Sequence, residues 1–307
     1  MPETRNGFGA RTGSERIVAF TKNLTNPNLQ AFRLGADRAA ALLGASVIHR
    51  IPTKPDDAAQ QIALLATMLA EKPDAILLGP AEDKALEPII ERLNAARIPI
   101  VNFASRMAAG DFVSYVGSDD VDMGCRAARY LLTRMRNHGN VVIIEGPQTT
   151  STSRDRVQGF KKALAECSGL HLVASVAGKY HEHDAYEAMS KVLKEFDNID
   201  AVLCANDSMA MGALDALDRA GRSTLVVGIN GTIQAAKAIE QGRLLASVDY
   251  SGFKMGCIAA EAAVRGLRRL KVPSQILLPT TVIDRANVAG WLTPVDQRTC
   301  PAWDQTT

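Results

Sequence analysis

Short runs of apolar residues alternate with longer segments whose apolar residues recur at helical spacing along most of the chain. The run RIVAF at residues 16–20 is typical of a buried strand. The segment PNLQAFRLGADRAAALLG at 27–44 is typical of a helix that ends at its last glycine. The same alternation continues to a last helix, FKMGCIAAEAAVRGL, at 253–267. Strands that alternate with helices of about 10 to 15 residues predict parallel sheets covered by helices on both faces.

The number and order of these elements predict the fold class. About ten strands are expected in two similar sets, which fits two sheets better than one. Right-handed crossovers between parallel strands make such sheets doubly wound. No Gly-, Ser- or Pro-rich linker separates the two sets, so we expect several short crossings, the first of them in VGSDDVDMG at 116–124. We therefore predict an α/β protein with two doubly wound parallel-sheet lobes.

Composition and charge exclude several classes of partner. The chain has 307 residues, of which 47% are hydrophobic and 22% are charged, as in soluble globular proteins. Its 35 basic and 33 acidic residues give a net charge of +2, so nothing indicates a nucleic acid or a membrane surface as partner. No apolar run approaches the roughly 20 residues that a membrane-spanning helix needs.

The N-terminus and the cysteines leave the cellular compartment open. The first residues, MPETRNGFGARTGSE, contain no apolar core of a signal peptide. The chain is therefore either cytoplasmic or a mature protein from which a signal peptide has been removed. Cys125, Cys204 and Cys257 lie in apolar segments and are expected to be buried small hydrophobic residues.

Motifs of known enzyme chemistry are absent from the sequence. It has no glycine-rich phosphate-binding loop, no G-x-S-x-G nucleophile elbow and no H-E-x-x-H or paired-cysteine metal motif. The H-x-H of YHEH at 180–183 is expected to be solvated surface, and the hydroxyl residues of TSTSR at 150–154 are expected to cap a helix. We therefore expect no catalytic residue, no cofactor and no metal, and a binding protein is favoured over an enzyme.

One predicted strand ends in polar residues that fit two roles. The apolar run at 201–205 stops at Asn206, Asp207 and Ser208, and a helical pattern follows. Asn, Asp and Ser satisfy the free N–H groups of a helix start. The carboxyl ends of strands in an open α/β sheet also line the ligand crevice, so ligand binding is the second role.

Four segments occur in an order that is typical of one family: LTNPNLQAFRLGADRAA (24–40), TSRDRVQGFKKAL (152–164), CANDSMAMGALDAL (204–217) and VVGINGTIQAAKAIEQGRLLASV (226–248). Together with IPIVNFASR and YVGSDD, they resemble the periplasmic sugar-binding proteins of the ribose and arabinose type. The resemblance implies two lobes joined by three hinge strands, with the sugar between the lobes. It implies a first lobe of residues 15–118 plus 251–279 and a second lobe of residues 119–250 plus 280–307. The hinge crossings would lie near residues 117–119, 248–250 and 279–282.

The resemblance assigns ligand contacts in the first lobe residue by residue. Asn26, before Pro27, falls on a position that hydrogen-bonds sugar hydroxyls, and it also suits a helix N-cap. Lys22 falls where the arabinose-binding relatives place a lysine on the ring oxygen, with a solvated loop lysine as the alternative. Asn28 and Leu29 stand where many relatives place aromatic rings against the sugar, so the usual stacking pair is missing.

The loop FASRM matches the family's Asp-Arg pair only imperfectly. Ala104 and Ser105 occupy the two matching positions, and Arg106 comes one place late. The resemblance therefore implies that Ser105 or Arg106 enters the site, and the sequence leaves both open.

In the second lobe, the resemblance assigns an arginine and an aromatic residue to the ligand. Arg156 in RDRVQGF matches the family arginine that donates a fork of hydrogen bonds to two hydroxyls, and Arg154 is the weaker candidate, with a structural role as its alternative. Tyr180 matches an aromatic residue that stacks on the sugar, with a surface turn residue as the alternative.

Three further positions in the second lobe follow from the resemblance. Asn206 matches an amide that donates to and accepts from vicinal hydroxyls, which leaves Asp207 and Ser208 as the helix cap. Asn230 stands where most relatives have Asp, and Tyr250 stands where the ribose-binding relatives have Gln.

These departures bear on the charge of the expected ligand. Two positions that are usually acidic, near 104 and at 230, are neutral here, while Lys22, Arg106 and Arg156 are positive. Asn, Ser and Tyr donate and accept hydrogen bonds equally well, so a neutral monosaccharide or sugar alcohol is expected. An anionic sugar is the alternative, because its carboxylate would meet these cations. A cationic amino sugar would meet no matched carboxylate.

The resemblance implies the solute-binding receptor of an ABC importer, a monomer whose lobes close on the ligand by hinge motion. Such a protein lies in the periplasm after removal of its signal peptide, docks on the membrane permease and binds no nucleic acid. The alternative is the effector-binding domain of a lac-repressor-like regulator without its DNA-binding module. Those regulators carry a helix-turn-helix module of roughly fifty residues, and only about fifteen residues precede the first strand here.

Overall fold

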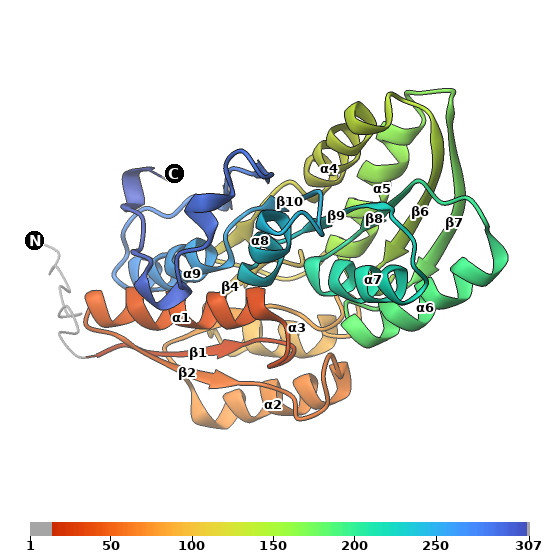
Figure 1. Cartoon of the computed structure of the whole chain (residues 1–307). Coiled ribbons are helices and arrows are strands. Elements are labelled where there is room, and N and C mark those ends of the chain that lie inside the picture. The colour runs from red at the N-terminus through yellow and green to blue at the C-terminus, as the bar shows by residue number, and fades with distance from the viewer. Residues whose placement is uncertain (1–13, 306–307) are drawn as a thin grey trace, which may run out of the picture.

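The computed structural model describes residues 14–305, which form two lobes, each built on its own sheet (Figure 1). The first sheet is parallel throughout and has the spatial order β11-β5-β4-β3-β1-β2. Its strands are β1 (Arg16–Phe20), β2 (Ser46–Arg50), β3 (Ala75–Leu78), β4 (Ile100–Phe103), β5 (Ser114–Gly117) and β11 (Gln275–Leu277). Its central strands are continuous buried runs because helices cover both faces of the sheet.

The second sheet has the spatial order β12-β10-β9-β8-β6-β7. Its strands are β6 (Gly139–Glu145), β7 (Leu170–Ala177), β8 (Ala201–Cys204), β9 (Leu225–Ile229), β10 (Ala246–Asp249) and β12 (Thr281–Ile283). The prediction of parallel sheets is wrong for β12 alone among these described strands, because β12 runs antiparallel to β10. The edge strands β11 and β12 were not predicted, since three residues are too few to show a strand pattern.

Nine helices within residues 14–305 cover the two sheets. The first lobe carries α1 (Pro27–Leu42), α2 (Ala58–Glu71), α3 (Glu87–Ala95) and α9 (Gly252–Leu267), and the second carries α4 (Asp120–Met135), α5 (Ser151–Leu164), α6 (Glu182–Glu195), α7 (Asp207–Arg219) and α8 (Ile233–Glu240). Helices α1 and α9 pack closely because Gly35 and Gly256 lack side chains: a Cβ at either position would lie 2.0 Å from a carbonyl oxygen of the other helix. None of the described helices is long and apolar enough to cross a membrane.

The chain passes between the two sheets three times. The passages lie between β5 and α4, between β10 and α9, and between β11 and β12. They support a division of the chain at the three crossings, with a proposed first lobe of 15–118 plus 251–279 and a proposed second lobe of 119–250 plus 280–307. Within the tail assigned to the second lobe, however, Asp296, Cys300 and Trp303 contact α1 and α9 of the first lobe. Residues 1–13, which include most of the polar N-terminal segment, lie outside the described residues.

One cysteine prediction is right about burial and wrong about chemistry, because Cys257 is buried but is not a free thiol. Cys257 in α9 forms a disulfide with Cys300 in the C-terminal tail, with the two Cα atoms 5.6 Å apart. Cys125 and Cys204 are free and buried, as predicted. The pair was missed because Cys300 lies in an irregular segment whose position no periodic pattern reveals.

Candidate functional site

The candidate site lies where the carboxyl ends of the strands of both sheets face each other. In open parallel α/β sheets the loops at these ends hold the ligand-binding residues. Here the residues predicted from the sequence lie in the loops after β1, β4, β7, β8 and β9, at the starts of α1 and α5, and at the crossing after β10. The fold therefore directs them toward one cleft between the lobes.

Arg156, on the second turn of α5, is the centre of the polar cluster in this cleft. Its guanidinium donates to a carboxylate oxygen of Asp120 at 2.7 Å and to the carbonyl oxygen of Ala205 at 2.8 Å. It also donates to the side-chain oxygen of Asn230 at 3.2 Å. Burial alone would lower the pKa of Arg156, but Asp120, Tyr180 and Tyr250 together outweigh burial and raise it. Arg156 is therefore a fixed, permanently charged donor whose charge is balanced inside the protein.

Tyr180 and Lys22 meet across the cleft. The Nζ atom of Lys22, in the first lobe, lies 5.2 Å from the centroid of the Tyr180 ring, in the second. The Tyr180 hydroxyl donates to the Thr152 hydroxyl at 3.1 Å. Both residues are buried, so the alternatives of a solvated loop lysine and a surface turn tyrosine are wrong. Burial lowers the pKa of Lys22, and the charge of Asp56 opposes that effect.

Asn206 is itself the cap of α7. Its side-chain oxygen accepts from the backbone N–H of Met209 at 2.8 Å, and its amide nitrogen donates to the carbonyl oxygen of Tyr180 at 3.2 Å. The assignment of the cap to Asp207 and Ser208 is therefore wrong. Asp207 instead accepts from the Ser247 hydroxyl at 2.7 Å, and burial raises the pKa of its carboxyl to about 6. One N–H of the Asn206 amide can still face a ligand, because the group carries two.

The start of α1 meets the second crossing through a hydrogen bond. The Asn28 amide donates to the hydroxyl of Tyr250 at 2.7 Å, and burial raises the pKa of that hydroxyl to about 12. The Arg156 guanidinium lies 5.4 Å from the Tyr250 ring centroid, so this contact joins the polar cluster. Asn26 caps α1 by accepting from the Asn28 backbone N–H at 2.9 Å, and Leu29 packs in the main hydrophobic cluster.

The two candidates in the loop after β4 take different directions. The hydroxyl of Ser105 is buried and lies 3.3 Å from the Thr152 hydroxyl of the other lobe. The Arg106 guanidinium instead stacks over the Tyr115 ring, 3.8 Å from its centroid, and donates to Gln275 at 2.7 Å, on the edge strand β11. Of these two side chains, Ser105 is buried against the second lobe, whereas Arg106 is exposed and held by Tyr115 and Gln275 of the first lobe.

The hydroxyl residues at the start of α5 join the lobes and do not cap the helix. Thr150 occupies the cap position but makes no side-chain cap hydrogen bond. The Ser151 hydroxyl accepts from the Arg106 backbone N–H at 2.7 Å. With the contacts of Thr152 to Ser105 and Tyr180, this overturns the expectation of capping for this segment.

Further contacts hold the lobes in a closed arrangement. The Asp83 backbone N–H donates to the Thr149 carbonyl oxygen at 3.1 Å, and the Asp83 carboxylate forms an ion pair with Arg154. The ring of His181 lies 3.1 Å from the carboxylate of Asp56. Arg154 thus has a structural role, and the expectation of a solvated surface is wrong for His181. No group of side chains that could hold a metal ion occurs among residues 14–305.

The expectation that the cleft carries only positive charge is wrong. Asp120 is buried against Arg156, and Asp56 lies beside Lys22 and His181. Asp120 was missed because it follows Asp119, which caps α4 by accepting from the Asp122 backbone N–H at 2.9 Å. A run of acidic residues at a helix start is typical of capping, and only the position of Arg156 in the fold shows the second role.

The backbone at Asn230 adopts an unusual conformation. Its φ angle is +134°, a region that residues other than glycine rarely adopt, and Gly231 follows at +62°. The Asn230 N–H donates to the carbonyl oxygen of Val248 at 2.9 Å, which fixes this conformation against β10. Such strain is concentrated at functional sites, where the surrounding structure holds it in place.

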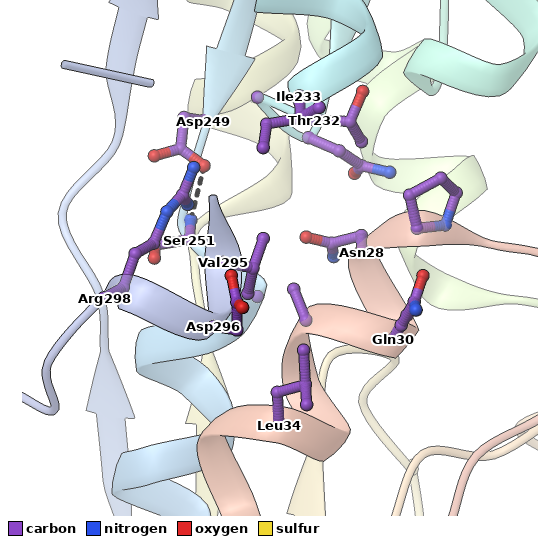
Figure 2. A pocket seen from close by; sticks show the side chains of 15 residues that line it. Asn28, Gln30, Leu34, Thr232, Ile233, Asp249, Ser251, Val295, Asp296 and Arg298 are labelled. Atoms are coloured by element: carbon purple, nitrogen blue, oxygen red, sulfur yellow. Dashed lines mark hydrogen bonds between the residues drawn. The ribbon is translucent and has the colours of Figure 1, made fainter. Parts of the chain in front are cut away.

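A cavity of about 380 Å³ adjoins the cleft near the second crossing. Figure 2 shows its walls, which come from the start of α1, the start of α8 and the C-terminal tail. Asn28 and Asn230 reach its edge, so the cavity adjoins the polar cluster.

Comparisons with known proteins agree with this geometry. The chain matches the family described as periplasmic binding protein domain over residues 17–269. A D-ribose/D-allose-binding protein of Pseudomonas aeruginosa is 32% identical over 218 residues, which cover 68% of each chain. The ribose import binding protein of Salmonella typhimurium is 27% identical over 262 residues, covering 85% of this chain and 88% of that protein.

A solved structure shows the same arrangement of lobes. It is an ABC transporter periplasmic solute-binding protein from Actinobacillus succinogenes with bound D-allose. It superimposes with a TM-score of 0.86 at 29% identity, and the match covers 90% of this chain and 100% of that chain.

Proposed function

Because the chain belongs to the periplasmic binding protein domain family and has the type I fold of that family, we propose that it is the solute receptor of an ABC importer. Its ligand in this proposal is a monosaccharide or a sugar alcohol, held between the two lobes. The observation that carries the proposal is the buried polar cluster around Arg156, to which side chains of both lobes contribute. Its relatives are binding proteins, so the regulator alternative is not favoured.

The groups in the cleft suit a neutral polyhydroxy ligand. Hydroxyl and amide side chains both donate and accept, as sugar hydroxyls do. The charge of Arg156 is balanced by Asp120, and Asp56 lies near Lys22, so a ligand carboxylate would compete with these two aspartates for the cations. An anionic sugar is therefore not part of the proposal.

The walls of the cleft accept either a ring or an open chain. Tyr180 supplies the aromatic ring of the second lobe, and the Nζ atom of Lys22 lies over it, 5.2 Å from its centroid. The positions on the first lobe that carry aromatic rings in many relatives are Asn28 and Leu29 here, and Asn28 is hydrogen-bonded to Tyr250. A flat sugar ring would therefore be stacked from one side only. A sugar alcohol has no ring to stack between two aromatic side chains. The missing aromatic residue should therefore lower its affinity less than that of a pyranose.

The periplasm is the proposed location. The disulfide between Cys257 and Cys300 supports it, since disulfides persist in oxidising compartments and are rare in the cytosol. We infer that a signal peptide is removed from the precursor, that the protein is a monomer and that its closed form docks on the membrane permease. No catalytic role is proposed.

A thermal-shift screen of pentoses, hexoses, sugar alcohols and sugar acids tests the proposal. A ligand that binds only the folded protein stabilises it by about 2.7 kcal/mol at a concentration 100 times its Kd. We expect a rise in melting temperature with at least one neutral sugar or sugar alcohol. No response to any neutral compound, or a response confined to sugar acids, would contradict the proposed ligand class.

A further inference from the structure

The C-terminal tail, residues 284–305, is first attached to the second lobe. Asp284 accepts from the Tyr130 hydroxyl of α4 at 2.7 Å. The Trp291 indole N–H donates to the carboxylate of Asp249 at 2.7 Å, at the end of β10. A short 3₁₀ helix, η1 (Val288–Trp291), packs against α8. This part of the tail is therefore fixed to the second lobe as far as the second crossing.

The tail is next attached to the first lobe. The Arg38 guanidinium, on α1, donates to the carbonyl oxygen of Asp296 at 2.6 Å and to that of Arg298. The disulfide joins Cys300 to Cys257 on α9. Beyond it, the ring of Trp303 lies 4.6 Å from the guanidinium of Arg265, also on α9. This end of the tail is therefore fixed to the first lobe, by a covalent bond among other contacts.

A short segment separates the two attachments, and Arg298 clamps it. The Arg298 guanidinium donates to the carbonyl oxygen of Trp291 at 3.1 Å and to that of Thr293 at 3.2 Å. The Arg298 side chain thus holds the backbone at Trp291, which belongs to the part attached to the second lobe, close to Arg298 itself, which belongs to the part attached to the first lobe. In addition to the three crossings between the sheets, the tail makes a fourth connection between the lobes.

The cavity beside the second crossing shows where this connection lies. Its walls include Leu34 from the first lobe, Ile233 from the second, and Val295 and Arg298 from the tail (Figure 2). Because the tail spans the seam between the two lobes there, a rotation that separates them must stretch the tail or break its contacts with Arg38 and Arg298.

We propose that the tail is a strap that restrains opening of the lobes and that the Cys257–Cys300 disulfide is its fixed end. The disulfide holds the strap at a high effective concentration beside α1 and α9, so contacts that break on opening form again readily. The intact strap therefore favours the closed arrangement, and a strap released from α9 allows a wider opening. The inference concerns the lobes themselves and does not depend on which ligand they bind.

Small-angle scattering of the ligand-free protein tests the strap. Cys300→Ser removes the disulfide, and Cys167→Ser, at a free and partly buried cysteine, is the matched control. We expect a larger radius of gyration for Cys300→Ser than for the wild type, and an unchanged value for Cys167→Ser. An equal radius of gyration for Cys300→Ser and the wild type would overturn the proposal.

A second variant leaves the disulfide intact in case Cys300→Ser folds poorly. Arg38→Ala removes both hydrogen bonds from α1 to the tail and should also increase the radius of gyration of the free protein. Thiol titration of the unfolded, unreduced protein gives an independent check. Three reactive thiols, from Cys125, Cys167 and Cys204, support the disulfide, and five would overturn it.

Discussion

Asp56 and His181 lie on opposite lobes, and a carboxylate oxygen of Asp56 is 3.1 Å from the His181 ring. Contact with Asp56 raises the pKa of His181 above its ordinary value of 6.5. The same pair contributes to the closed arrangement and is absent once the lobes separate. The protonation of one histidine is therefore linked to closure of the cleft.

This pair predicts that ligand affinity falls as the pH rises. The pKa of His181 is raised in the closed form, so its contribution is complete below pH 6.5 and is lost as the pH rises through the raised value. Calorimetric titration of a ligand from the screen, across this range, measures the effect. His181→Gln should flatten the profile, and His183→Gln, two residues further along the chain, should not. Identical pH profiles of affinity for the two variants would show that His181 does not link pH to ligand binding.

The buried pair of Asp120 and Arg156 predicts a large loss of stability on truncation. Removing one partner of a buried ion pair typically costs about 3–5 kcal/mol, because the other charge stays buried without compensation. Asp120→Ala should therefore lower the free energy of unfolding by that order, as measured in urea. Asp119→Ala is the matched control and should cost about 1 kcal/mol, since it removes only a helix cap. A smaller loss for Asp120→Ala than for Asp119→Ala would show that the pair contributes little.

Asn206 has a capping role and a proposed ligand role, and two substitutions separate them. Serine caps helices about as well as asparagine but lacks the amide donor. Asn206→Ser should keep the helix cap but lose the hydrogen bond to the Tyr180 carbonyl oxygen, so its melting temperature should fall less than that of Asn206→Ala. It should weaken ligand binding by about 1–3 kcal/mol, because a ligand group is left unpaired. Asn206→Ala should lose both stability and affinity. If Asn206→Ser bound the ligand with wild-type affinity, Asn206 would have a capping role and no role in ligand binding.

Asn230 predicts the polarity of the ligand on its side of the cleft. Its oxygen already accepts from Arg156, so its amide nitrogen remains to donate to a ligand oxygen. Asn230→Asp would replace this donor with a negative charge. We expect binding to weaken tenfold or more, about 1.4 kcal/mol or above, in a calorimetric titration. Tighter binding of the same ligand by Asn230→Asp would show that the amide acts only as an acceptor.

Much of the fold could be predicted because its elements carry strong local patterns. The helix expected from PNLQAFRLGADRAAALLG is α1, Pro27–Leu42, and the strand expected from RIVAF is β1, Arg16–Phe20. Where the pattern was short, as in the three-residue strand β12, nothing in the sequence revealed the pairing.

The candidate site could be predicted only where its residues belong to a recognisable segment. Arg156 and Asn206 follow from such segments, and the structure buries both beside the cleft. Asp120 and His181 were missed because their roles depend on partners from distant segments, Arg156 and Asp56. A carboxylate at a helix start and a histidine in a polar turn look like surface residues until the fold supplies their partners.

The central claim is that a neutral sugar or sugar alcohol binds between the lobes, against the cluster around Arg156. A crystal structure of the protein with the strongest ligand from the thermal-shift screen tests it most directly. We expect ligand hydroxyls within hydrogen-bonding distance of Arg156 and Asn206 in the second lobe. We also expect one within hydrogen-bonding distance of Asn28 or Lys22 in the first lobe. A ligand found outside this cleft, in the neighbouring cavity or in contact with one lobe alone, would contradict it.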